Sequence, residues 1–127
     1  MTTSTKRHVL VVDDEEGIRE LLVEFMTRSG YRVTAVESPE DAQHVVRQDP
    51  PDLVISDLQL ESSDGMEMIR KLRSGLPDIP MVLLTGVGFA PAVVRDMLRK
   101  KMVSSYLQKT CPWGEIVGEV QRLIGTC

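Results

Sequence analysis

Five short segments rich in β-branched residues and leucine recur along the chain, and longer stretches of mixed polarity separate them. The segments are residues 8–12, 32–36, 53–56, 81–84 and 103–107. Continuous apolar runs of this length suit strands that are buried on both faces, as in a parallel sheet covered by helices. Because such runs could also be short buried helices, the choice depends on the stretches between them.

The intervening stretches have apolar residues at three- and four-residue spacing, which is typical of amphipathic helices. In the first stretch the apolar positions are Ile18, Leu21, Leu22, Phe25 and Met26, and Gly30 follows as a stop signal. Ser38 and Pro39 are suited to the cap and the first turn of a second helix. We predict three further helices, after residue 65, after residue 91 and from about residue 112.

Strands that alternate with helices imply parallel pairing through right-handed crossovers. The fold class is therefore α/β, with five βα units forming a doubly wound five-stranded parallel sheet. At 127 residues the chain has the usual size of one domain. We expect residues 1–127 to be a single domain, and we leave open whether it is the N-terminal part of a longer protein.

Charge and cysteine content narrow the classes of protein. The formal net charge of −4 gives no general attraction to nucleic acid, so we expect no direct nucleic-acid binding by this domain. The two cysteines, Cys111 and Cys127, do not form the framework of a secreted domain. No apolar run approaches the roughly 20 residues of a membrane helix, and no export signal is visible. We therefore expect a cytoplasmic domain without a membrane contact.

Polar residues follow four of the predicted strands. Asp13 and Asp14 come after the first strand, Asp57 after the third, Thr85 after the fourth and Lys109 after the fifth. In a doubly wound sheet these carboxyl ends of the strands form the functional crevice. An isolated Asp at a strand end is more often a turn residue or a helix cap. The joint placement of five such residues at one edge instead favours a site.

Three carboxylates at one edge repel one another unless a cation neutralises them. Oxygen ligands without His or Cys favour Mg²⁺. With a hydroxyl and an ammonium group nearby, this set is suited to phosphoryl transfer to a carboxylate. Asp57 is the best candidate for the nucleophile because it stands alone after the central strand.

The chain resembles the receiver domains of bacterial response regulators in two-component systems, and the resemblance covers essentially its whole length. The matching motifs are Val-Val-Asp-Asp-Glu at 11–15, Asp-Leu-Val-Ile-Ser-Asp at 52–57, Asp-Gly at 64–65, Leu-Leu-Thr-Gly at 83–86 and Tyr-Leu-Gln-Lys at 106–109. The resemblance implies a flavodoxin-like fold with strand order 2-1-3-4-5.

It also implies the roles of the site residues. Asp57 would be the phosphoacceptor and a ligand of Mg²⁺, Asp14 a direct ligand, Asp13 a ligand mostly through water, and the backbone carbonyl of Gln59 the remaining protein ligand. Such a domain is not an enzyme, although it has self-phosphorylation and self-dephosphorylation chemistry.

The remaining residues would carry the switch. Thr85 would bind one phosphoryl oxygen and Lys109 another, and Tyr106 matches the aromatic residue that turns inward when Thr85 moves. The fourth helix, the fifth strand and the fifth helix would then change as one face. The implied partners are a sensor histidine kinase or phosphotransfer protein and an effector domain or downstream protein, and the same face is a candidate homodimer interface.

Some positions differ from the family pattern. Glu61 and Thr110 each stand where the family usually has proline, Met102-Val103 replaces Gly-Ala, and the segment from Thr85 to Lys109 is longer. The sequence therefore predicts that the output face is the least typical part of the domain.

Two other functions fit parts of this pattern. A Mg²⁺-dependent aspartyl-phosphate hydrolase acting on small molecules would need a second Asp two residues after the nucleophile, where this chain has Gln59. A docking platform without phosphoryl chemistry would not need the acids, Thr85 and Lys109 together.

Overall fold

The structure is a computed structural model, and it describes residues 6–57, 70, 79–85, 99, 104–108 and 112–125. For Pro39, Asp57, Thr85, Ser105, Tyr106 and Gln108 it describes the backbone alone. The predicted third and fourth helices lie outside the described residues, apart from Arg70 and Arg99, which are both helical.

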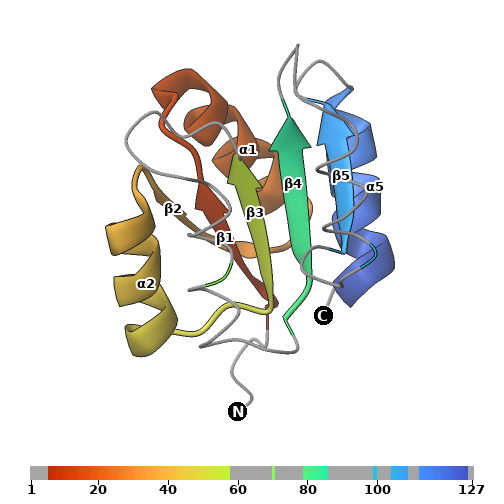
Figure 1. Ribbon diagram of the computed structural model, residues 1–127. Helices are drawn as coiled ribbons and strands as arrows, with labels where there is room; N and C mark the ends of the chain where they lie inside the picture. The colour runs from red at the N-terminus through yellow and green to blue at the C-terminus, as the bar shows by residue number, and fades with distance from the viewer. Residues whose placement is uncertain are drawn as a thin grey trace.

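A five-stranded parallel sheet with the order β2-β1-β3-β4-β5 is the centre of the molecule, and this confirms the predicted fold class (Figure 1). Its strands are β1 His8–Val12, β2 Arg32–Val36, β3 Leu53–Asp57, β4 Met81–Thr85 and β5 Ser105–Gln108. The fifth strand begins two residues later than the sequence predicts. Ser104 still bonds to Met81, through its backbone N–H (2.7 Å) and its hydroxyl (3.2 Å), before the regular ladder starts at Ser105.

The described helices agree with the three end signals that the sequence predicts, namely the stop after the first helix and the starts of the second and the fifth. They are α1 Glu16–Arg28, α2 Pro39–Gln48 and α5 Trp113–Ile124. Gly30 has a φ of 98°, a left-handed conformation that favours glycine after the end of α1. At α2 the Ser38 hydroxyl accepts a hydrogen bond from the backbone N–H of Asp41 (3.2 Å).

The two faces of the sheet have different covers (Figure 1): α1 and α5 lie on one face and α2 on the other. The core cluster on the first face includes Val9 and Val11 of β1, Leu22 and Met26 of α1, and Val120 of α5. Leu21, which the spacing also assigned to the apolar stripe of α1, is 38% exposed. It lies at the margin of a stripe whose centre is Leu22 and Met26, so the buried face of α1 is narrower than predicted.

Among the described residues, no helix is long and apolar enough to span a membrane.

Candidate phosphoacceptor and metal site

The pairing of the strands brings three of the predicted site residues, Asp13, Asp57 and Thr85, to one edge of the sheet. Val12 of β1 pairs with Ser56 of β3. The next positions are Asp13, which directly follows β1, and Asp57, the last residue of β3. Asp57 in turn pairs with Leu84, which places Thr85 one position further along β4. Thr85 is the final residue of its strand, as Asp57 is of β3.

The register extends to the fifth strand, where Thr85 pairs with Gln108. The candidate ammonium group, Lys109, directly follows Gln108 in the sequence. Lys109 and Gln59 lie outside the described residues, as do the side chains of Asp57, Thr85 and Tyr106. Their proposed roles stay predictions.

Asp13 is held firmly at the start of the β1–α1 connection. It is fully buried, and its Oδ1 accepts a hydrogen bond from the backbone N–H of Glu15 (2.9 Å). Its own backbone N–H donates to the carbonyl of Val36 (3.1 Å), and its carbonyl accepts from Nη1 of Arg19 (2.8 Å). These bonds fix a carboxylate away from solvent, where a charge is stable only with a counter-charge or strong hydrogen bonds.

Three acidic side chains gather at this point. One carboxylate oxygen from each of Asp13, Asp14 and Glu15 lies within 4.8 Å of the others, and Asp14 and Glu15 are exposed. A set of oxygen ligands that is open to water on one side fits Mg²⁺, which keeps several of its waters when bound to protein. The residues that the structure describes therefore suit the predicted ion.

Glu15 was not among the metal ligands predicted from the sequence. Its signal was its position directly after the two predicted aspartates, at the start of a helix, where an acidic residue also stabilises the helix dipole. Because that ordinary role explains an acidic residue here, the sequence does not show that a carboxylate oxygen of Glu15 lies close to those of Asp13 and Asp14.

Two other residues with polar or aromatic side chains make contacts within the fold. His8 is 1% exposed, and its Nε2 lies 2.8 Å from the Thr34 hydroxyl. Trp113 begins α5, packs against the core and stacks on Phe25 with the ring centroids 5.7 Å apart.

Comparison with known proteins identifies the family. A family model described as the response regulator receiver domain matches residues 9–121. The transcriptional regulatory protein GlrR of Escherichia coli is 37% identical over 87 residues, which are 68% of this chain and 20% of GlrR. The C4-dicarboxylate transport transcriptional regulatory protein DctD of Pseudomonas aeruginosa is 28% identical over 116 residues, 91% of this chain and 25% of DctD.

Among solved structures, the chemotaxis response regulator CheY4 of Vibrio cholerae has a TM-score of 0.82 at 23% identity. The match covers 94% of this chain and 100% of that one, and at this identity it shows a shared fold. The chain spans only a fifth to a quarter of the length of GlrR and DctD. The family match over residues 9–121, together with the strand order, shows that this chain belongs to the response regulator receiver domain family of two-component systems.

Proposed function

We propose that this receiver domain accepts a phosphoryl group on Asp57 from a histidine kinase or a phosphotransfer protein, in a reaction that depends on Mg²⁺. The observation that carries the proposal is the strand register. It supports a single edge on which Asp57 ends β3 beside the buried Asp13 of the β1–α1 connection. Asp57 is then next to the acidic cluster and one strand away from Thr85.

In the proposed reaction a carboxylate oxygen of Asp57 attacks the phosphorus of a phosphohistidine. A phosphorus–oxygen bond forms, the phosphorus–nitrogen bond breaks, and the imidazole leaves with the bonding electron pair and takes up a proton. Bound Mg²⁺ would neutralise the oxygens of the transferred group. The ligands of this Mg²⁺ ion would be Asp13, Asp14, Asp57 and the backbone carbonyl of Gln59. Glu15 lies close enough to the cluster to contribute a further oxygen.

Thr85 and Lys109 would bind the transferred oxygens, with the hydroxyl and the ammonium group each donating a hydrogen bond. Phosphorylation adds charge that these donors recognise and the bare carboxylate lacks, which gives a basis for a two-state switch. Tyr106 of β5, together with the fourth helix and α5, would carry the change to an effector domain or partner, or to a second copy of the chain. We infer that this signalling takes place in the cytoplasm.

The experiment is incubation with acetyl phosphate and MgCl₂, followed by intact-mass measurement. The expected result is the added mass of one phosphoryl group, which hydroxylamine removes because an acyl phosphate is reactive. Asp57→Asn should abolish the addition, and chelation of Mg²⁺ with EDTA should suppress it.

Asp41→Asn is the matched control, since Asp41 is exposed in the first turn of α2, on the other face of the sheet from α1 and α5. It should react like the wild type. An unmodified wild type, under conditions in which another receiver domain reacts, would contradict the proposal. Steady turnover of p-nitrophenyl phosphate that Asp57→Asn abolishes would favour the small-molecule hydrolase instead.

A further inference from the structure

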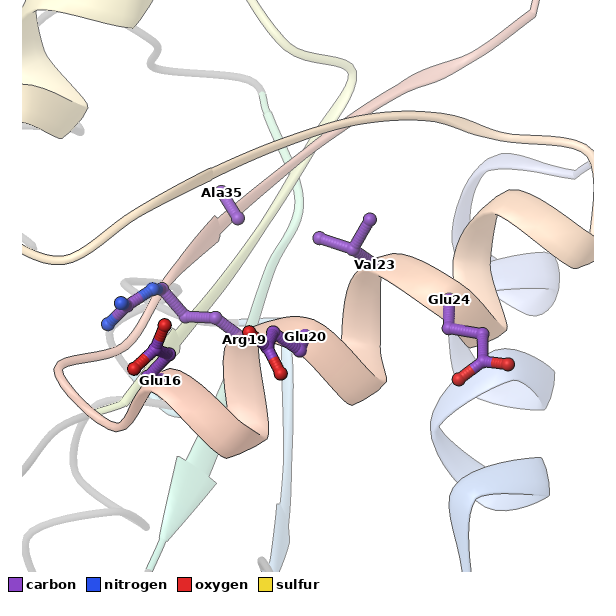
Figure 2. A pocket seen from close by; sticks show the side chains of 6 residues that line it. All are labelled: Glu16, Arg19, Glu20, Val23, Glu24 and Ala35. Carbon is purple, nitrogen blue, oxygen red and sulfur yellow. The ribbon is translucent and has the colours of Figure 1, made fainter.

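An open groove of about 350 Å³ lies between α1 and the edge strand β2 (Figure 2). Its lining comes from five residues of α1 and one residue of β2: Glu16, Arg19, Glu20, Val23, Glu24 and Ala35. It lies on the β2 side of α1, whereas Phe25 on the same helix stacks on Trp113 of α5. The groove therefore leaves the contact of α1 with α5 untouched.

The floor of the groove is apolar. In Figure 2, Val23 points from α1 toward β2, and the Cβ of Ala35 points back toward the helix. Both residues are half-buried. Ala35 packs against the core cluster, and Val23 is not among the described residues that do so. Val23 thus has apolar surface that the described part of the fold leaves partly in contact with water.

The rim of the groove is mainly acidic. Glu16, Glu20 and Glu24 are exposed and follow one another at four-residue spacing, an arrangement that destabilises a helix through like-charge repulsion. Glu24 forms an ion pair with Arg28 (2.7 Å). Within the part of the chain that the structure describes, Glu16 and Glu20 have no ion-pair partner.

The single cation of the lining has a structural task. Nη1 of Arg19 donates to the carbonyl oxygen of Asp13 (2.8 Å), which holds the guanidinium at the N-terminal end of α1. Because that hydrogen bond restrains Arg19, the guanidinium is poorly placed to form an ion pair with Glu20, which lies further along the helix. A ligand with its own positive charge would complement Glu16 and Glu20.

We propose that the α1–β2 groove is a docking site for a protein segment that carries one apolar side chain between basic residues. The apolar side chain would cover Val23 and Ala35, and a basic residue would pair with Glu20. The groove adjoins the phosphoacceptor edge at Arg19, but the binding proposed here involves Glu20, Val23 and Ala35, which lie outside the acidic cluster. Its test therefore needs neither Mg²⁺ nor a phosphoryl donor.

The probe is the synthetic peptide acetyl-Lys-Arg-Leu-Arg-Lys-amide, titrated into the ¹⁵N-labelled chain in EDTA. The expected result is a saturable set of amide shifts centred on α1 and β2. A control peptide with serine in place of leucine has the same charge and should bind more weakly. Raising NaCl from about 0.1 M to about 1 M, which shortens the Debye length from about 10 Å to about 3 Å, should also weaken binding.

Two variants separate the groove from the overall charge of the domain. Glu20→Gln should weaken peptide binding about twofold to fivefold, the range expected for one exposed ion pair. Glu40→Gln makes the same charge change at an exposed residue of α2, on the other face of the sheet. It should leave the affinity for the peptide unchanged. Val23→Thr keeps the shape of the side chain but replaces a methyl by a hydroxyl, and should also weaken binding.

Three results would overturn the proposal. The first is equal affinity for the leucine and serine peptides, which would indicate attraction by charge alone. The second is an equal effect of Glu20→Gln and Glu40→Gln. The third is a set of α1–β2 shifts that depends on protein concentration without peptide, which would make the occupant a second copy of this chain.

Discussion

The hydroxyl of Tyr31 donates a hydrogen bond to the carbonyl oxygen of Gly125 (2.9 Å), and the two residues are 94 positions apart. Tyr31 is 1% exposed and precedes β2, while Gly125 caps the C-terminal end of α5 with a φ of 68°. The bond therefore joins the turn after α1 to the last turn of the final helix. It satisfies a helix-end carbonyl that the helix itself cannot pair.

Replacing Tyr31 by Phe removes this bond and keeps the ring in the core. We expect the free energy of unfolding to fall by about 1 kcal/mol, the usual net value of one intramolecular hydrogen bond. Urea unfolding followed by circular dichroism measures the change, and the slope with urea should stay constant. An unchanged midpoint would show that water replaces the tyrosine at no cost.

A second contact, between α1 and α5 themselves, is the stack of Phe25 on Trp113, with an interplanar angle of 10°. Such a pair contributes about 0.5–1.5 kcal/mol beyond the area it buries. A double-mutant cycle with Phe25→Leu and Trp113→Leu should give a coupling free energy in this range. Because Trp113 is the only tryptophan, Phe25→Leu should also shift its fluorescence to longer wavelength. Additive effects of the two substitutions would contradict the stack.

These contacts mark the limit of what the sequence predicts. Local signals predicted the strands, the end of α1 and the start of α2, because β-branched runs, the Ser38 cap and Gly30 each act within a few residues. The stack of Phe25 on Trp113 joins residues 88 positions apart (25 and 113) and depends on how α1 and α5 lie against each other. Spacing along one helix has no information about that packing.

The site shows the same division. Because the functional crevice of a doubly wound sheet lies at the carboxyl ends of its strands, we predicted that Asp13, Asp57 and Thr85 lie at one edge. The strand register agrees with this rule of strand ends. The rule could not show that Asp13 is fully buried while Asp14 is exposed, since adjacent residues in a connection have no fixed alternation. It also missed Glu15, whose carboxylate comes close only through the turn between β1 and α1.

The buried imidazole of His8 makes a testable contribution to the opposite end of the sheet. Its Nε2 lies 2.8 Å from Oγ1 of Thr34, and its Nδ1 lies 3.4 Å from the carbonyl oxygen of Pro50. Thr34→Val keeps the branched shape and leaves Nε2 without this partner. We expect a loss of about 1–3 kcal/mol in the free energy of unfolding, measured by urea titration. A variant as stable as the wild type would contradict a structural role for this bond.

Removal of one acidic group should separate metal binding from stability. Asp14 is exposed, and asparagine has nearly the same shape. Asp14→Asn therefore removes one charge from the acidic cluster without changing how far the side chains of the cluster are buried. In EDTA we expect a slightly higher melting temperature than that of the wild type, because repulsion within the cluster falls. In MgCl₂ we expect a smaller rise than the wild type shows, since a ligand that binds the folded state more weakly stabilises it less, by RT ln(1 + c/Kd) at a free ligand concentration c.

Differential scanning calorimetry with and without MgCl₂ measures both effects, and Asp41→Asn controls for loss of a carboxylate elsewhere. Equal responses of Asp14→Asn and the wild type to MgCl₂ would place the ion away from Asp14.

The pair of Arg32 and Asp49 predicts a pH dependence with a definite sign. Two guanidinium nitrogens of Arg32 donate to the two oxygens of Asp49, and about half of each side chain is exposed. The hydrogen bond from Arg32 holds the pKa of Asp49 below its usual value. The pKa of Arg32 is raised by the same bond, so Arg32 stays charged throughout the acid range.

Because the pKa of Asp49 is lower in the folded state, its contribution to stability is present above the unfolded value of about 3.9 and is lost as the pH falls through the folded value. Asp49→Asn should therefore be less stable than the wild type at pH 7, and the difference should shrink below about pH 4. Urea unfolding from pH 7 to pH 3 measures this trend. The control is the same comparison in an Arg32→Gln background, where the destabilisation by Asp49→Asn should depend less on pH. An equal pH dependence in both backgrounds would show that the hydrogen bond from Arg32 is not its cause.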